Sequence, residues 1–310
     1  ACIVVTYNRL ELLKQCINAL LHQSFNNFDI IVVNNGSTDG TEKWLKENPQ
    51  IKFFTQENLG GAGGFHNGIK YAYQSGYDYF WIMDDDGISD RFCLEKLTSV
   101  AKQGSQYVAP LLYTETGTCH WPYLLNTKFN ELSHSGGPFN AILLSRKLIE
   151  CVGLPNKYYF IWGDEFEFLN RVKEAFFHTT LVKDAIHYHK IPENKNTIDK
   201  RIYYKVRNLI WSTRLSNGIL RSKLSYRSST IFQIVKYCFH YLLHFKYTSL
   251  FYVLRGIKDG ISMDLDILCL SVYIWNVDHI QKLCHLLKER KPELKIIIGG
   301  PEVTYEIDHF

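Results

Sequence analysis

Three consecutive aspartates, Asp84, Asp85 and Asp86, follow the apolar run YFWIM and should lie at the carboxyl end of a buried strand. Side chains alternate along an extended chain, so Asp84 and Asp86 share one face. Two carboxylates that converge from one face suit Mg²⁺ or Mn²⁺ bound together with a diphosphate. Asp85 then points the other way, toward a ribose or sugar hydroxyl. The alternative is a solvated turn that ends at Gly87.

A second acidic group, Asp164 and Glu165, lies in the segment WGDEFEF. Glu165 is a candidate general base, which would take a proton from a hydroxyl group. A structural alternative fits the same residues, because Asp164 with Glu167 three residues later has the pattern of an N-terminal helix cap. The sequence leaves both interpretations open.

Two histidines, His187 and His189, alternate onto one face of a short predicted strand, AIHYH. One imidazole is a candidate third ligand for a metal held by Asp84 and Asp86. Histidines of this kind are more often packed or exposed to solvent without a metal, so that alternative also stays open.

The segment 58–68, NLGGAGGFHNG, contains four glycines within five residues. Glycine lets a backbone approach a ligand closely and adopt positive φ angles, so we expect a loop that lines a ligand, with a plain tight turn as the alternative. The spacing differs from the GxxxxGK(S/T) of a P-loop, and His66 occupies the last position of GxGxxG. Arg9 follows the first strand in the segment TYNR. Its side chain could contact a diphosphate, and the alternative is a surface charge without a ligand.

The elements that must position these residues alternate between strand and helix in the first half of the chain. Apolar runs predict buried strands at 1–6, 29–34, 51–55 and 77–83, and helical spacing predicts helices at 10–21 and 41–47 and through 69–73. This alternation indicates an α/β doubly wound sheet, in which ligands bind outside the carboxyl ends of the strands. After Tyr113 the periodicity weakens until a helix that begins near Asp164.

The second half of the chain is basic and aromatic. Residues 200–258 contain twelve Lys or Arg and no Asp or Glu, so in a chain of net charge +4 the remaining residues carry −8. The pattern is helical from 201 to about 261, and then returns to strand, helix and strand at 265–273, 277–290 and 294–298.

Residues 231–254 mix large apolar side chains with Lys236, His240, His244 and Lys246. Such a helix suits a membrane interface, and its cations favour anionic lipid. The alternative is a helix packed on the first half of the chain with a basic outer face. Nothing resembles a nucleic-acid reading head or stacking module, so we expect no nucleic-acid partner.

The overall composition, 46% hydrophobic and 21% charged over 310 residues, excludes a disordered chain. Eight cysteines lack metal-binding spacing and predict reduced thiols in a cytosolic setting. No apolar stretch reaches the length of a membrane span, and no signal peptide precedes the first strand. Because the chain opens within a strand and without Met, we expect that residue 1 is not the native start.

Five motifs together resemble the inverting family 2 glycosyltransferases with a GT-A fold, in their order and their spacing: VVTYNR, NNGSTDGT, ENLGGAGGFHNG, WIMDDD and FIWGDEFEFLNR. The resemblance covers residues 1–262, and its NLGGAGGF and MDDD are most similar to the galactofuranosyltransferase and rhamnosyltransferase-like branch. It implies a GT-A catalytic domain over 1–199, a Rossmann-like doubly wound mixed sheet. A basic aromatic helical segment over 200–262 and a partial βαβ unit over 263–310 would follow.

The resemblance also implies roles for individual residues. Asp84 and Asp86 match the metal ligands of the family's DXD motif, and His189 resembles its late histidine ligand, with His187 as the fallback. Glu165 stands at the position of the base, beside Asp164. Donor contacts are implied for Thr6, Arg9, Asn35, Asp39, Asn58, Gly60, Gly61, Gly63, Asp84 and Asp85. Two residues depart from the family, because Asn34 stands where Asp is common and Glu165 replaces the usual Asp.

The activity implied by the resemblance is an inverting transfer that depends on Mn²⁺ or Mg²⁺. The donor would be a UDP- or dTDP-linked sugar of galactofuranose or rhamnose type, and the acceptor a glycan or lipid-linked glycan in cell-envelope polysaccharide synthesis. The protein would then be cytoplasmic and peripheral on the inner face of the plasma membrane. The alternative is a nucleotide-sugar binding protein of the same fold without turnover.

The tail, residues 263–310, instead resembles part of the cobalamin-binding domain found ahead of radical-SAM enzymes. The sequence lacks the DxHxxG loop of the cobalt ligand and the CxxxCxxC of the iron–sulfur site. We therefore expect no cobalamin chemistry and interpret the tail as a truncated fusion or a gene-joining artefact.

Overall fold

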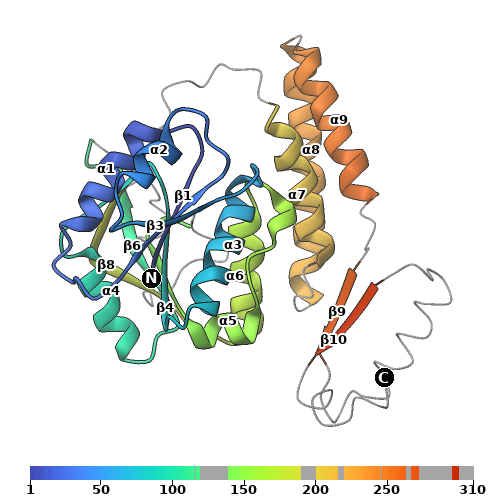
Figure 1. Ribbon diagram of the computed structural model, residues 1–310. Helices are drawn as coiled ribbons and strands as arrows, with labels where there is room; N and C mark the ends of the chain where they lie inside the picture. Colours follow the sequence, from blue (N-terminus) through green and yellow to red (C-terminus); the bar gives the residue numbers. More distant parts are fainter. Residues whose placement is uncertain are drawn as a thin grey trace. The chain divides into compact units, whose positions relative to one another are not determined.

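The structure is a computed structural model that describes residues 1–114, 116–118, 139–189, 200–215, 220–244, 246–262, 267–271 and 295–299 (Figure 1). The chain divides into two compact units, residues 1–261 and residues 262–310.

The first unit is built on a mixed sheet, which confirms the predicted α/β class. Eight strands of the described chain lie in the order β3-β2-β1-β4-β7-β6-β8-β5. They are β1 Cys2–Thr6, β2 Ile30–Asn34, β3 Lys52–Thr55, β4 Tyr79–Asp84, β5 Gly87–Ser89, β6 Tyr107–Tyr113, β7 Ile142–Ser145 and β8 Thr179–His189. The four strands from β3 to β4 are parallel, β7 is antiparallel to β4 and β6, and β5 is antiparallel to β8.

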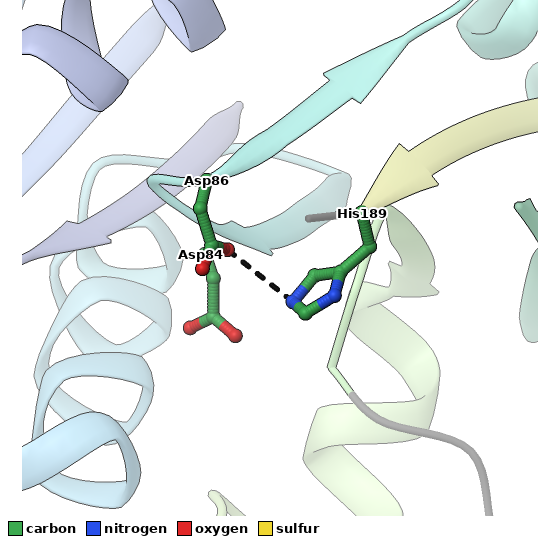
Figure 2. Close-up of side chains that lie close together, drawn as sticks. All are labelled: Asp84, Asp86 and His189. Atoms are coloured by element: carbon green, nitrogen blue, oxygen red, sulfur yellow. Dashed lines mark ion pairs between the residues drawn. The ribbon is translucent and has the colours of Figure 1, made fainter. Parts of the chain in front are cut away.

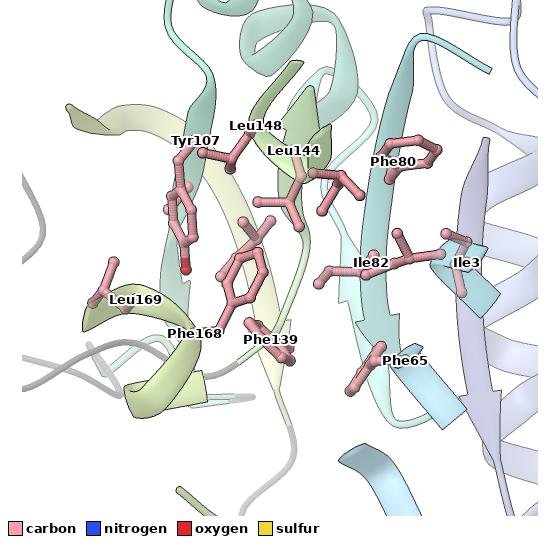
Figure 3. Packing of buried hydrophobic residues seen from close by; sticks show 14 of the residues in the cluster. Ile3, Phe65, Phe80, Ile82, Tyr107, Phe139, Leu144, Leu148, Phe168 and Leu169 are labelled. Carbon is pink, nitrogen blue, oxygen red and sulfur yellow. The ribbon is translucent and has the colours of Figure 1, made fainter. Parts of the chain in front are cut away.

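Helices cover both faces of this sheet. They are α1 Leu10–Leu21, α2 Thr41–Lys46, α3 Gly60–Gln74, α4 Cys93–Lys102, α5 Arg146–Val152 and α6 Asp164–Glu174, with a 3₁₀ turn, η2, at Lys157–Tyr159. Ile3 and Val5 of β1 pack with residues of α3 and α6 in one apolar cluster (Figure 3), whereas Cys2 and Val4 pack with α1 and α4 in another. Burial on both faces explains why the strands are continuous apolar runs in the sequence.

The glycine-rich segment was wrongly predicted to be a loop or a tight turn. Helix α3 begins at Gly60, so all four glycines lie within the helix. A Cβ atom on Gly64 would lie 2.4 Å from Val5 Cγ1, and one on Gly68 would lie 2.5 Å from Ile3 Cγ2. These glycines therefore allow α3 to pack closely on β1, so their spacing reflects helix–sheet contact.

The described residues between 201 and 261 lie mostly in helices, as predicted. They are α7 Ile202–Leu215, α8 Leu220–Leu243 and α9 Tyr247–Ile261 (Figure 1). These helices belong to the first unit, and Ile202, Val206 and Val253 form a small core among them. None of the helices in the described chain is both long enough and apolar enough to span a membrane.

The second unit contains two parallel strands, β9 Ile267–Ser271 and β10 Lys295–Gly299, with Ile267 opposite Lys295. Both strands were predicted. The helix predicted at 277–290 lies outside the described residues.

Candidate active site

Strand pairing brings the acidic triplet and the late histidine together. Strand β4 ends at Asp84, and β5 begins at Gly87 and pairs with β8 so that Gly87 lies opposite His189. This register sets the His189 imidazole beside Asp86, and Figure 2 shows both aspartates close to that ring.

Asp84, Asp86 and His189 offer three ligand atoms that all lie within 4.8 Å of one another. His189 Nε2 lies 3.3 Å from Asp86 Oδ1, and all three side chains are half-buried. Two carboxylate oxygens and one imidazole nitrogen form a donor set that Mn²⁺ accepts, and their convergence fits a single divalent cation.

The electrostatics of this group favour an added cation. Burial raises the pKa of Asp84 to about 8, with further increases from Asp86 and Asp85. Burial alone would also raise the pKa of Asp86, but the hydrogen bond and charge of His189, together with Arg9, lower it. Burial opposes protonation of His189, but Asp86 and Asp84 raise its pKa above the usual value. A divalent cation would relieve the repulsion between the carboxylates.

The raised pKa of Asp84 predicts how the stability of the metal-free protein depends on pH. Folded Asp84 keeps its proton up to about pH 8, whereas unfolded Asp84 releases it near pH 3.8, so the free energy of unfolding falls as pH rises through this window. The amide side chain in Asp84→Asn is uncharged at every pH, so this variant should lose part of the dependence of the free energy of unfolding on pH. At about pH 8 the substitution should raise the melting temperature of the metal-free protein by several degrees, which corresponds to a gain of about 1–3 kcal/mol in the free energy of unfolding.

Thermal unfolding in EDTA at about pH 5 and about pH 8 measures this difference for the wild type and Asp84→Asn. Equal pH slopes in the two proteins would show that Asp84 does not hold its proton in the folded state.

His187 is not part of the candidate ligand set. It is fully buried, its Nδ1 lies 2.8 Å from Ser89 Oγ, and burial lowers its pKa to about 3. A Cβ atom on Gly87 would lie 2.2 Å from His187 Nε2, so the ring packs against the start of β5.

Asp85 lies on the other side of the triplet and is held by protein groups. Thr6 Oγ1 donates a hydrogen bond to Asp85 at 2.7 Å. Arg9 Nη1 lies 3.2 Å from Asp85 and 2.8 Å from Asp86. Burial raises the pKa of Asp85 to about 6, against the opposing charge of Arg9. Arg9 therefore joins the end of β1 to the acidic turn.

Several predicted donor-binding residues organise the loops at the carboxyl ends of the strands. Asn35 Nδ2 donates to Gly60 O at 3.0 Å, and Asn58 Oδ1 accepts from Gly60 N–H at 2.9 Å. Asp39 accepts from the N–H of Leu10 at 2.9 Å, which secures the start of α1.

The remaining predicted donor-binding positions lie at the start of α3. A Cβ atom on Gly63 would meet the Leu59 side chain at 2.3 Å, so Gly63 packs within its own helix. A Cβ atom on Gly61 would meet nothing within 4 Å, so this position faces open space. Asn34, which replaces the family's common Asp, bridges the ends of β2 and β3 through Thr55 Oγ1 at 3.2 Å.

Asp164 and Glu165 open helix α6, but the predicted helix cap is wrong. The N-cap residue is Gly163, with φ 93°, and it has no side chain that could cap the helix. The Glu167 carboxylate instead pairs with Arg171 at 2.6 Å, one turn further along. Asp164 cannot be the helix cap because Gly163 occupies the N-cap position and Asp164 lies inside the first turn.

The two carboxyl groups of this pair differ in environment. Asp164 is almost fully buried, and burial, then the charge and hydrogen bond of Glu165, raise its pKa well above the usual value. The raised pKa favours the protonated form of Asp164, which can donate to Glu165. Glu165 is partly exposed, and its Oε2 accepts from Gly163 N–H at 3.2 Å. The two carboxyl groups therefore differ in burial and in hydrogen-bond partners.

Comparison with known proteins matches the first part of the chain to a family model. The family model of glycosyl transferase family 2 matches residues 1–149. Residues 1–149, just under half of the chain, therefore resemble a family 2 glycosyltransferase domain. The acidic triplet lies within this domain, whereas Glu165 and His189 lie beyond the matched residues.

Relatives of the family 2 domain include galactofuranosyltransferases. The chain is 29% identical over 192 residues to the galactofuranosyltransferase GlfT1 of Mycolicibacterium smegmatis, which is 55% of this chain and 64% of that protein. Identity to GlfT1 of Mycobacterium tuberculosis is also 29%, over 55% of this chain and 63% of that protein. The chain thus spans a little under two thirds of the length of these curated relatives.

Solved structures with the same fold are GT-A glycosyltransferases. The S. aureus TarS fragment 1–349 in complex with UDP-GlcNAc is 14% identical with a TM-score of 0.57, over 74% of this chain and 70% of that one. The mannosyltransferase PcManGT from Pyrobaculum calidifontis, in complex with GDP-Man and Mn²⁺, is 15% identical with a TM-score of 0.54, over 94% and 81%. At these identities the likeness shows the GT-A fold.

Proposed function

We propose that this chain is an inverting, metal-dependent glycosyltransferase. The observation that carries the proposal is the convergence of Asp84, Asp86 and His189 at the carboxyl edge of a family 2 domain. The same edge is the usual ligand side of a doubly wound sheet. The buried acid Asp164, with Glu165 as its acceptor, supplies the second component that the reaction requires.

In the proposed mechanism, Asp84, Asp86 and His189 would hold a divalent cation, which would neutralise charge on a leaving nucleoside diphosphate. Glu165 takes the proton from the acceptor hydroxyl as that oxygen attacks the anomeric carbon. Asp164 keeps its own proton and holds the Glu165 carboxylate in place by a hydrogen bond. The sugar–phosphate bond breaks as the new glycosidic bond forms, so one displacement inverts the anomeric configuration.

We propose a UDP- or dTDP-linked sugar of galactofuranose or rhamnose type as the donor, and a glycan or lipid-linked glycan hydroxyl as the acceptor. The names of the GlfT1 relatives support galactofuranose, and the TarS complex with UDP-GlcNAc supports a nucleotide-sugar donor. The donor would contact Arg9, Asp39, Asn58 and Asp85 and the open side of α3 at Gly61.

A donor panel tests the proposal. We expect one UDP- or dTDP-sugar to raise the melting temperature with Mn²⁺ and not in EDTA, and to release nucleoside diphosphate on incubation. A thermal shift without any release, with acceptor present, would indicate a nucleotide-sugar binding protein without turnover.

We also propose that helices α8 and α9 contact an anionic membrane, where a lipid-linked acceptor would be reached. Large apolar side chains at 232, 235, 239 and 242 follow helical spacing on α8 and are exposed, with Phe232 at 70% and Phe239 at 64%. Lys236, His240 and Lys246 lie between and after them, and 200–258 contain no acidic residue. Apolar side chains in the lipid and cations at the headgroups suit an anionic bilayer surface.

The full chain should therefore sediment with vesicles that contain anionic phosphatidylglycerol. Phe232→Ser with Phe239→Ser should weaken this binding by about tenfold or more, because each Phe contributes about 1.5–3 kcal/mol when buried. Phe176→Ser is the matched control, since Phe176 is 89% exposed after α6 and should not matter. Equal binding of the double variant would contradict membrane contact through this face of α8, and equal binding to neutral vesicles would contradict the preference for an anionic surface.

The remaining sequence-based expectations stay proposals. We place the protein in the cytoplasm, on the inner face of the plasma membrane; Cys2, Cys16, Cys93, Cys151 and Cys238 are free thiols, which supports a reducing setting. We propose no cobalamin chemistry and no function for the tail, residues 263–310.

A further inference from the structure

The loop that leads into helix α6 has an unusual backbone. Phe160, Trp162 and Gly163 have φ angles of 67°, 61° and 93°. Two of the three are bulky residues, which rarely occupy the left-handed region and do so only where surrounding structure holds them. The Asp164–Glu165 pair follows directly, so its position depends on whatever fixes this loop.

Two neighbouring residues of α7, Arg207 and Asn208, fix the loop by its carbonyl groups. Asn208 Nδ2 lies 2.9, 2.8 and 2.7 Å from the carbonyl oxygens of Tyr159, Ile161 and Trp162. Arg207 Nη2 donates to the carbonyls of Tyr158 and Tyr159 at 2.9 and 2.8 Å. Arg207 also donates from Nε and Nη2 to Asn208 Oδ1 at 2.9 and 2.8 Å, which orients the amide.

Arg207 and Asn208 are themselves held in place. Asn208 is 1% exposed and Arg207 is 9% exposed. The Arg207 guanidinium lies 4.1 Å from the centre of the Trp211 ring and 5.0 Å from that of Tyr204. Tyr204 in turn stacks on Phe160, with ring centres 4.7 Å apart and planes at 18°. Residues of α7 therefore hold the loop through its backbone carbonyls and through the side chain of Phe160.

The same loop touches the donor side of the candidate site. Phe160 O accepts from Ala62 N–H at 3.0 Å, and a Cβ atom on Gly60 would lie 2.1 Å from Phe160 O. The loop thus joins the start of α3, beside the proposed donor, to α7. Helix α6 has an independent anchor, because Phe168, Leu169 and Val172 are fully buried in the core.

We propose that Arg207 and Asn208 are positioning residues for the Asp164–Glu165 pair. They hold the 158–163 loop so that Gly163 N–H and Asp164 both meet the Glu165 carboxylate. This inference rests on the proposed function, in which Glu165 is the base. It makes α7 part of the machinery that positions the base, and not only a link to the membrane-facing helices.

Asn208→Ala should lower kcat by about a hundredfold, which is the loss that a misplacement of about 1 Å can cause. The donor KM should stay within about threefold, because the acidic triplet is untouched. Thr213→Val is the matched control on the same helix: Thr213 is buried and hydrogen-bonds Thr230 of α8, not the loop, so kcat should be unchanged. Should Asn208→Ala fail to fold, Arg207→Lys keeps the charge, loses the forked contacts and should lower kcat by about tenfold.

A double-mutant cycle separates positioning from general damage. In the Glu165→Gln background, adding Asn208→Ala should lower kcat by less than about a further threefold, because the effect of Asn208 on kcat passes through Glu165. If instead the two losses multiply, or if Asn208→Ala leaves kcat unchanged while the wild type is active, the positioning role is wrong. Absence of turnover in the wild type would overturn the proposed function itself, which is a distinct result.

Discussion

Sugar transfer should fall by about three orders of magnitude or more when Asp86 is replaced with Ala, because the charge stabilisation from a bound metal is worth several kcal/mol. Asp86 also carries the ion pairs to His189 and Arg9, so its loss should remove Mn²⁺-dependent donor binding as well. The fold should survive, since Asp86 lies in the turn between β4 and β5 and outside the apolar clusters.

Circular dichroism and a Mn²⁺ titration followed by the donor assay measure this prediction. Asp29→Asn is the matched control, because Asp29 precedes β2 at the opposite end of the sheet and pairs with Lys52. Normal turnover in Asp86→Ala would exclude the acidic triplet as the metal site.

Replacing Glu165 with Gln should lower kcat by about two to four orders of magnitude and spare donor affinity. The amide keeps the size of the side chain and can still accept from Gly163 N–H, but it cannot take a proton from the acceptor. Donor affinity should hold because the proposed donor contacts, Arg9, Asp39 and Asp85, follow β1, β2 and β4, outside helix α6.

Glu167→Gln is the control for this variant, since Glu167 lies in the same first turn and pairs with Arg171. Steady-state kinetics at a saturating donor concentration separate the outcomes. If Asp164→Asn abolishes proton transfer and Glu165→Gln does not, the roles within the pair are reversed.

The first half of the fold was predictable because strands that are buried on both faces have unbroken apolar sequences. Helix α1 has its predicted bounds, and β1 and β2 each begin one residue later than expected. Strand β5, in contrast, has three residues and carries no periodic signal of its own. Yet β5 sets the register that brings His189 to Asp86 and leaves His187 on Ser89. Alternation along the strand predicted only that the two histidines share a face, and the preference for His189 came from the resemblance.

Other features of the site depend on contacts distant in the sequence. The glycines of α3 are explained by Val5, Ile3 and Phe160, whose approach no local pattern reveals. The proposed roles of Arg207 and Asn208 require the loop before α6 to meet α7, whose contacting residues lie 48 and 49 positions further along the chain. Arg207 and Asn208 are adjacent in the segment YYKVRN, and from the sequence this segment indicates only part of a cationic helix.

The most direct test of the central claim is release of nucleoside diphosphate from a UDP- or dTDP-sugar by the full chain, with acceptor and Mn²⁺ present. The account predicts release that requires the divalent ion, stops in EDTA and is lost in Asp86→Ala, with a product of inverted anomeric configuration. Release that is equal in EDTA, or a product of retained configuration, would contradict it.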